Sequence, residues 1–140
     1  MNGPDFLDTN VLVYAHDIRA GQKHTIARDL VRHLWDTRQG ALSTQVLQEF
    51  YVTATRKMAI PLDRPAARQI VREYGRWHLE QISVSHIIAA SEIEARYQLS
   101  FWDALIISAA QQIGASRVLS EDLQSGQTLA GVRIENPLAP

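Results

Sequence analysis

Apolar residues recur along most of the chain at the spacing of an amphipathic helix, and short apolar segments separate these stretches. Ile26, Leu30 and Leu34, for example, would share one face of a helix, and the pattern stops at Gly40. This spacing predicts helices over residues 11–15, 23–37, 44–58, 63–77, 87–97 and 100–113. Short apolar runs predict strands or extended segments over residues 4–8, 41–43, 82–84, 117–120 and 133–136.

The order of these elements, in which short strands alternate with helices, is typical of an α/β domain. Neighbouring parallel strands need a helical crossover, so this order predicts a small, mostly parallel central sheet. No internal repeat, low-complexity tract or Pro/Gly-rich linker interrupts the chain. We therefore expect residues 1–140 to form a single domain.

The composition narrows the chemistry that this domain can perform. The 14 basic and 15 acidic residues give a net charge of −1, which argues against a uniformly basic nucleic-acid-binding protein. The charge is nevertheless polarised, because residues 19–76 hold 11 of the basic groups and only 5 of the acidic ones. Without cysteine the chain has no thiolate nucleophile and no cysteine-ligated metal site, which leaves oxygen and imidazole chemistry.

The N-terminal sequence and the length of the apolar runs indicate the compartment in which the protein works. The N-terminus carries Asp5 and Asp8 before any apolar run, unlike a signal peptide, which has a basic start and a long apolar stretch. No apolar run approaches the roughly 18 residues of a membrane span. We expect a cytoplasmic protein without a membrane partner, and the absence of cysteine agrees with a reducing compartment.

Four acidic residues stand at positions that favour a metal site. Asp8 ends the predicted strand 4–8, and Asp122 comes shortly after the predicted strand 117–120. Open α/β sheets bind ligands beyond the carboxyl ends of their strands. Glu49 and Asp103 lie among apolar residues in predicted helices, and no Lys or Arg lies within one turn of Asp103. A partly buried carboxylate needs a compensating cation or hydrogen bonds. A divalent metal ion would supply that compensation.

Each of these acids also has a structural explanation. Asp8 or Asn10 could cap the following helix, and Asp103 could form a capping box with Ser100. Glu49 alone could be a solvated helix residue, and Asp122 could be an ordinary turn former. Only the combination of the four favours a functional site.

Four segments in order along the chain carry a family resemblance: FLDTNVLVYA, STQVLQEFY, FWDALIISAA and VLSEDLQSG. Together they resemble a PIN domain, and specifically the VapC-type ribonuclease toxins of type II toxin–antitoxin pairs. The resemblance implies a PIN-like α/β/α sandwich in which Asp8, Glu49, Asp103 and Asp122 form the catalytic, metal-holding quartet. Thr9, Asn10 and Ser120 match the polar residues that support it. The expected partners are an RNA substrate, a VapB-type antitoxin and a second copy of the chain in a homodimer.

The implied cofactor is Mg²⁺, with Mn²⁺ as an alternative. Mg²⁺ is a hard cation that prefers oxygen ligands and keeps several waters, so a few carboxylates in a cleft suit it. Such an ion polarises a phosphoryl oxygen and activates a bound water, and the reaction class would be hydrolysis of RNA phosphodiesters. Whether one ion or two would act stays open at this point.

Basic residues in the middle of the chain form a second candidate. The spacing of four residues would place their guanidinium groups in one stripe along the predicted helix 63–77, and Glu73 is the only acid between residues 64 and 76. We expect the stripe to contact RNA phosphates or an acidic partner. The alternative is a solvated helix face whose arginines pair with neighbouring acids. Its members are Arg64, Arg68, Arg72 and Arg76. The five histidines show no metal-type pair on one helical turn.

Other functions for aspartates in an α/β domain fit less well. A haloacid-dehalogenase-like phosphatase would have an aspartate two residues after Asp8, where this chain has Asn10. A receiver domain would have a lysine near the late strands, and the only lysines are Lys23 and Lys57. The remaining alternative is a non-catalytic PIN-like module that binds RNA or protein.

Overall fold

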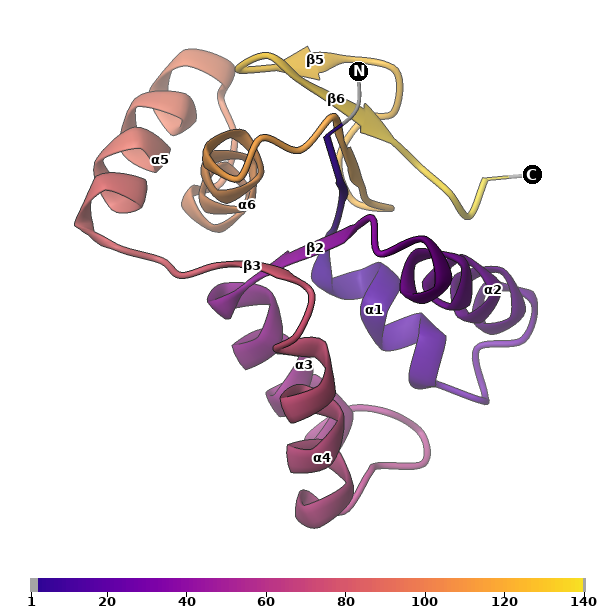
Figure 1. Ribbon diagram of the computed structural model, residues 1–140. Helices are drawn as coiled ribbons and strands as arrows, with labels where there is room; N and C mark the ends of the chain where they lie inside the picture. Colours follow the sequence, from indigo (N-terminus) through magenta and orange to yellow (C-terminus); the bar gives the residue numbers. More distant parts are fainter. Residues whose placement is uncertain (1–2, 140) are drawn as a thin grey trace.

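The computed structural model describes residues 3–139. These residues form six strands, which make one sheet, and six helices that pack against it (Figure 1). The first half of the chain holds β1 (Asp5–Leu7), α1 (Thr9–His16), α2 (Gln22–Thr37), β2 (Gly40–Ser43), α3 (Thr44–Arg56) and α4 (Arg64–Tyr74). The second half holds β3 (His78–Glu80), α5 (Val84–Tyr97), α6 (Phe101–Gln112), β4 (Arg117–Leu119), β5 (Thr128–Leu129) and β6 (Val132–Glu135). None of the helices among these residues is long and apolar enough to cross a membrane.

The sheet is mostly parallel, as the alternation of strands and helices predicts. Its strand order is β3-β2-β1-β4-β6-β5, and only the β5–β6 pair is antiparallel. Figure 1 shows α1 to α4 on one side of the sheet and α5 and α6 on the other, which confirms the α/β/α sandwich. The chain runs outward from β1 to β2 and β3, then returns to place β4 on the opposite side of β1. This reversal makes the carboxyl ends of β1 and β4 the expected ligand-binding edge.

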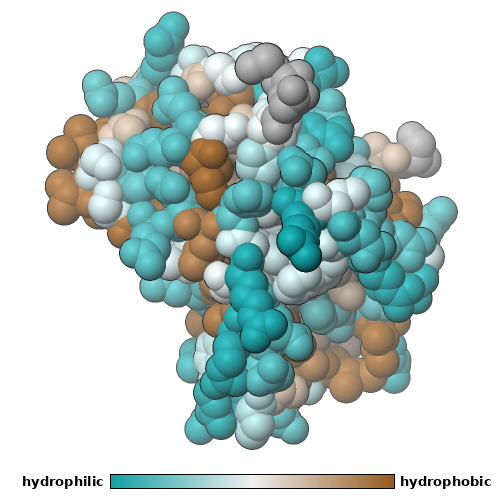
Figure 2. Space-filling view, viewed as in Figure 1, coloured by the Kyte–Doolittle hydropathy of each residue, from teal (hydrophilic) through white to brown (hydrophobic). Residues whose placement is uncertain are grey.

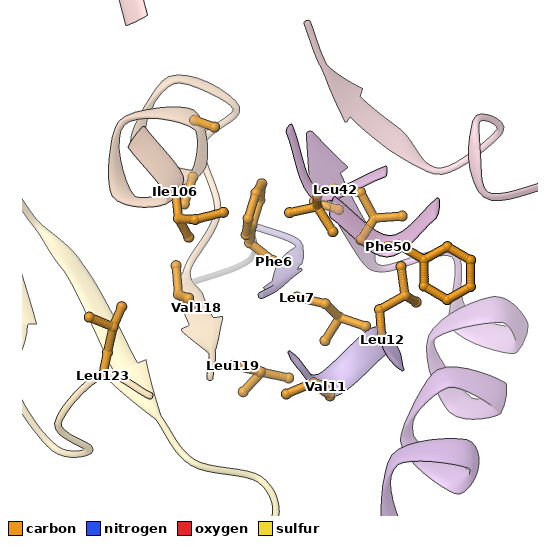
Figure 3. Packing of buried hydrophobic residues seen from close by; sticks show 14 of the residues in the cluster. Phe6, Leu7, Val11, Leu12, Leu42, Phe50, Ile106, Val118, Leu119 and Leu123 are labelled. Carbon is orange, nitrogen blue, oxygen red and sulfur yellow. The ribbon is translucent and has the colours of Figure 1, made fainter. Parts of the chain in front are cut away.

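The centre of the core is β1, which is flanked on both sides by buried strands. Phe6 and Leu7 are fully buried, and Figure 3 shows them among side chains from β2, β4, α1 and α6. A strand covered on both faces reads as a continuous apolar run, which is why PDFL predicted a strand without alternation. The labelled neighbours include Leu12, Leu42, Ile106, Val118 and Leu119. This packing fixes the position of Asp8, the residue that follows β1.

One predicted strand is wrong. The alternation of Ile82 and Val84 with serines indicated an extended segment, but α5 begins at Val84, and the strand of this region is β3, at His78–Glu80. His86 ends the extended segment, because its Nδ1 accepts a hydrogen bond from the Ser83 backbone N at 3.0 Å and closes a capping box. Val84 is 71% exposed, so the alternation of apolar residues and serines does not reflect a strand with one buried face.

The end of one helix and the presence of one strand also differ from the sequence expectation. The helix predicted over residues 63–77 ends at Tyr74, because Gly75 caps it and the backbone N of Trp77 bonds the Tyr74 carbonyl in a turn. Arg76 therefore lies outside α4 and does not continue the arginine stripe. Strand β5 was not expected, since two residues carry too little pattern to detect.

Gly40 gives a stability prediction. A Cβ at this position would lie 2.3 Å from Cζ3 of Trp77, whose ring is held by edge contacts with Trp35 and Tyr74. We expect Gly40→Ala to lower the free energy of unfolding by about 1–3 kcal/mol through overpacking. Urea unfolding measures this effect. Gly75→Ala, at a residue of right-handed helical backbone, is the matched control and should change stability by less than about 1 kcal/mol. Equal stability of both variants would contradict the packing of Trp77 on β2.

Candidate active site

Asp8 is the most buried of the four acids, at 5% exposure. It follows β1 directly, and its backbone N donates to the Leu119 carbonyl at 3.0 Å, which joins it to the end of β4. Its carboxylate accepts from the Thr9 backbone N and from the Ser120 hydroxyl, both at 2.7 Å. Asp8 therefore does cap α1, as the structural explanation proposed. The cap also fixes its carboxylate at the carboxyl edge of the sheet.

Asp122 is brought to the same edge by Asn10. The Asn10 amide donates to Asp122 Oδ2 at 3.0 Å, and its carbonyl oxygen accepts from the Glu121 backbone N at 3.2 Å. The Ser120 hydroxyl accepts from the Asp122 backbone N at 3.2 Å. Asp122 itself is exposed. Asn10 and Ser120 thus tie the first turn of α1 to the loop after β4.

Glu49 approaches from α3. The Thr9 hydroxyl donates to Glu49 Oε1 at 2.5 Å, so this glutamate is not an isolated solvated residue of the helix surface. Gln45, one turn earlier on α3, donates to Glu49 Oε2 at 3.2 Å and to the Trp102 carbonyl at 3.2 Å. Through Gln45, α3 is linked to the first turn of α6, next to Asp103.

Gln45 is a residue of the site that the sequence analysis missed. It is 5% exposed, and its Oε1 is buried with no hydrogen-bond partner among the described residues. The available signal was its position four residues before Glu49, where a side chain shares the same helical face. A buried polar side chain of this kind serves to position its neighbours.

Asp103 lies in the first turn of α6, which begins after Ser100. The Ser100 hydroxyl accepts from the Asp103 backbone N at 3.1 Å. The return bond of a full capping box, from the Ser100 backbone to the Asp103 carboxylate, is absent from the hydrogen bonds of residues 3–139. The Asp103 residue is half-buried, and a hydrogen bond with the Ser100 side chain partly opposes the effect of burial on its pKa.

The electrostatics show that the four carboxylates share one region. Burial raises the pKa of Asp8 to about 6, and the charges of Asp103 and Asp122 add to this effect against its hydrogen bonds. Burial also raises the pKa of Asp103, with added repulsion from Asp122 and Glu49. The ion pairs found within residues 3–139 involve none of these four acids. The cluster therefore carries negative charge that the surrounding protein leaves uncompensated.

The donor set fits a hydrated hard cation better than an enclosed one. Within the described part of the chain, no three His, Asp or Glu side chains are arranged closely enough to enclose a metal ion. Mg²⁺ usually keeps several waters and binds through one or two carboxylates, so it does not need such a cage. Three features favour Mg²⁺ at this site. The donors of the four acids are all oxygen atoms, the carboxylates repel one another, and none of the ion pairs among residues 3–139 involves them.

The arginines expected to form a stripe are exposed, and three of them, Arg64, Arg68 and Arg72, lie on α4. None of the ion pairs among residues 3–139 involves them. Arg72 donates to the neutral side chain of Gln69 at 2.6 Å. Figure 2 shows strongly hydrophilic colour along α4 on the viewed face. The helix thus presents free cationic groups to solvent.

Comparisons with known proteins agree with this architecture. A family model described as PIN domain matches residues 6–126. A toxin–antitoxin complex from Klebsiella pneumoniae superposes with a TM-score of 0.69 at 18% identity, covering 95% of this chain and 97% of the other. DNA-bound VapBC from Salmonella typhimurium gives 0.66 at 19% identity, covering 96% and 98%. A sarcin-ricin loop cleaving VapC toxin of Mycobacterium tuberculosis gives 0.63 at 19% identity, covering 92% and 98%. No curated protein sequence matches significantly.

The protein is a small α/β/α domain, and its carboxylates gather at the edge of the sheet where the strand order reverses. The family match spans most of the chain and includes Asp8, Glu49, Asp103 and Asp122. The chain therefore belongs to the PIN domain family, and the resemblance seen in the sequence is confirmed. Its fold is the one found in VapC toxins.

Asp8 gives a pH prediction for the metal-free protein. Its pKa is raised from 3.8 to about 6 on folding, so stability from this group is lost as the pH rises from about 4 to beyond 6. At 1.36 kcal/mol per unit, the loss reaches about 3 kcal/mol. Asp8→Asn should match the wild type at pH 4 and exceed its stability by about 2 kcal/mol at pH 7 in urea unfolding with EDTA. A constant difference between the two proteins over this range would contradict the burial of a charged Asp8.

Proposed function

We propose that this chain is a metal-dependent endoribonuclease and the toxin of a toxin–antitoxin pair. The observation that carries the proposal is the convergence of four acids, Asp8, Glu49, Asp103 and Asp122, at the carboxyl edge of β1 and β4. Within residues 3–139, no basic residue forms an ion pair with them. Membership of the PIN domain family and a VapC-like fold support it.

The roles of the residues follow from their contacts. Asp8 and Asp103 would hold Mg²⁺ or Mn²⁺, with Glu49 and Asp122 contributing directly or through water. When bound, such an ion polarises a phosphodiester and lowers the pKa of a water molecule. Ser120 holds the Asp8 carboxylate, and Thr9 holds that of Glu49. Asn10 keeps Asp122 beside the cluster. These bonds orient oxygens that would otherwise repel one another.

A cleavage assay tests this function. The purified chain should cut single-stranded and loop-containing RNA in Mg²⁺, stop cutting when EDTA is added, and resume when Mg²⁺ or Mn²⁺ is restored. Duplex DNA of matched sequence is the substrate control. If cleavage of the RNA continued at the same rate in EDTA, the activity would not come from a metal-held site.

The second candidate is a PIN-like module that binds RNA or protein without cutting it. The exposed arginines of α4 favour this possibility, because they could bind phosphates without any help from the acids. The two functions differ in one result. The module would retain RNA in a gel-shift assay and leave it intact with Mg²⁺ or Mn²⁺ present.

The proposed protein partner is a VapB-type antitoxin. The similar structures include VapBC complexes from Salmonella typhimurium and Rickettsia felis, each bound to DNA. A partner of this kind would cover the acidic cluster and present a basic side chain to it. Co-purification of the chain with the product of a neighbouring gene tests this assignment. We further propose that the toxin works in the cytoplasm, where its RNA substrates would be.

We also propose a homodimer through the outer face of α5 and the start of α6. This apolar face consists of residues between 47% and 71% exposed: Val84, Ile87, Ile88 and Trp102. Figure 2 shows hydrophobic colour at the left edge of the molecule, over α5. An exposed apolar patch of this kind marks an interaction surface. Ile88→Asp should convert a dimer to a monomer in light scattering, whereas Ser91→Asp, at another exposed position on α5, should not.

The arginines of α4 give a prediction about binding. Arg68→Gln together with Arg72→Gln should weaken the affinity for RNA or for the antitoxin. If RNA is the ligand, the salt dependence should also flatten, by about one unit of slope for each lost phosphate contact. Mn²⁺ binding should not change. Titrations at several salt concentrations measure both quantities, and an unaltered affinity and slope for both ligands would mean that these arginines are solvated surface.

A further inference from the structure

A pocket of about 530 Å³ lies at the end of the sheet opposite to the acids. The acids follow the carboxyl ends of β1 and β4, whereas this pocket lies at the start of β2, at the start of β3 and beside the end of α2. Its lining includes Trp35, Arg38, Gly40, Arg76, Trp77 and His78. The volume is in the range of small-ligand sites. Neither the proposed catalytic site nor the apolar face of α5 uses these residues.

The aromatic part of the pocket is rigid. Trp35 and Trp77 meet edge to face, with ring centroids 5.4 Å apart. Trp35 also stacks on Tyr74 at 5.7 Å, and Tyr74 is buried. Trp35 nevertheless keeps 38% of its surface exposed. A supported and partly exposed aromatic ring offers a flat ligand a surface at little cost in conformational entropy.

The polar part of the pocket is cationic. Arg38 and Arg76 are both exposed, and no Asp or Glu is among the lining residues. Neither guanidinium takes part in the ion pairs found within residues 3–139. His78, the first residue of β3, has its Nε2 at 3.0 Å from the Arg38 carbonyl. The two arginines therefore remain available to an anion.

A flat aromatic surface beside two free guanidinium groups matches the chemistry of a nucleotide. Bases stack on aromatic side chains without regard to sequence, and arginine forms paired hydrogen bonds with phosphate. We propose that this pocket is an anchoring site for single-stranded RNA, which holds one base against Trp35 and its phosphate between Arg38 and Arg76. A neutral apolar peptide would leave both arginines without a partner.

The position of the site gives it a role distinct from cleavage. From Gly40 to Ser43, β2 spans about 10 Å at roughly 3.3 Å per residue. A flexible strand of RNA can therefore reach from the pocket, at the amino ends of the strands, to their carboxyl ends. The proposal rests on the proposed function to the extent that RNA is the substrate. An anchor at this distance would raise affinity without contributing to the chemical step.

The test measures RNA binding in EDTA, where no metal-dependent cleavage occurs. A fluorescein-labelled oligouridylate is titrated with the wild type, with Arg38→Gln plus Arg76→Gln, and with Trp35→Leu. We expect each variant to bind at least fivefold more weakly, and the wild type to lose tryptophan fluorescence on binding unlabelled RNA. Arg19→Gln plus Arg96→Gln removes the same charge from exposed positions outside the pocket and should stay within twofold. The arginine variants keep the test valid if Trp35→Leu is unstable.

The outcomes separate this proposal from the proposed function. Wild-type affinity in the Arg38 and Arg76 double variant would overturn the anchor, whether or not the protein cleaves RNA. Equal losses in that variant and in its charge-matched control would also overturn it, since they would indicate general electrostatic attraction. Loss of antitoxin co-purification with unchanged RNA affinity would assign the pocket to a protein instead. Weakened binding in a chain that never cleaves RNA would support the anchor and refute the ribonuclease.

Discussion

Replacing Asp8 with Asn should lower RNA cleavage in Mg²⁺ by at least about 100-fold while the protein stays folded. Changing groups that merely support a metal ligand typically costs 10- to 100-fold, so loss of a buried ligand should cost at least as much. The substitution keeps the shape of the side chain and its potential to pair with the Ser120 hydroxyl. It also removes a buried charge, so the fold itself should not suffer. Initial rates of cleavage on one labelled RNA measure the effect.

The matched control for Asp8 lies at the other end of the same strand. Asp5 is the first residue of β1, and its carboxylate is paired with Arg117, whose Nε lies 2.8 Å away. Asp5→Asn should therefore lower stability and leave the cleavage rate of the folded protein within about threefold. An Asp8→Asn protein that kept more than a tenth of the wild-type rate would remove Asp8 from the catalytic group.

Asp122→Asn should lower cleavage by about 10- to 100-fold, whereas Glu121→Gln should leave it within about threefold. The two carboxylates are adjacent in the chain, but their surroundings differ. Glu121 bonds Lys23 at 2.6 Å and the Tyr14 hydroxyl at 2.8 Å, and these bonds hold its pKa below the usual range. Asp122 instead bonds Asn10 and repels Asp8 and Asp103.

This pair of variants separates a local role from a general one. Both substitutions remove one negative charge from the same loop, so a general effect on RNA attraction would change both rates equally. A difference confined to Asp122→Asn indicates membership of the metal site. If Glu121→Gln proved the more damaging of the two, the loop would act through its link to Lys23 rather than through the acid cluster.

The helices could be predicted from the sequence because their apolar spacing extends over several turns. Even so, the pattern did not place their ends. The end of α4 depends on a turn around Gly75, and the start of α5 depends on the bond between His86 and the Ser83 backbone. Local side-chain bonds of this kind compete with periodicity over two or three residues. Periodicity carries no information about them.

The acids of the candidate site could be predicted, but their connections could not. Asp8 and Asp122 stood out by their positions at strand ends, and Glu49 and Asp103 by their apolar surroundings in helices. The resemblance to PIN domains then joined the four acids into one site. The bond between Thr9 and Glu49 joins residues 40 positions apart, and the bond between Asn10 and Asp122 joins residues 112 apart. Such pairs depend on how the helices cross the sheet. The same reason hid Gln45 and the pocket that brings Trp35 to Trp77.

Isothermal titration calorimetry with Mn²⁺ is the most direct test of the central claim, which is that the acid cluster holds a divalent ion. It requires neither the RNA substrate nor the antitoxin to be known. The wild type and Glu121→Gln should bind Mn²⁺ with similar affinity, in competition with Mg²⁺, and Asp8→Asn should bind at least about tenfold more weakly. Equal Mn²⁺ affinity of Asp8→Asn and the wild type would contradict the account.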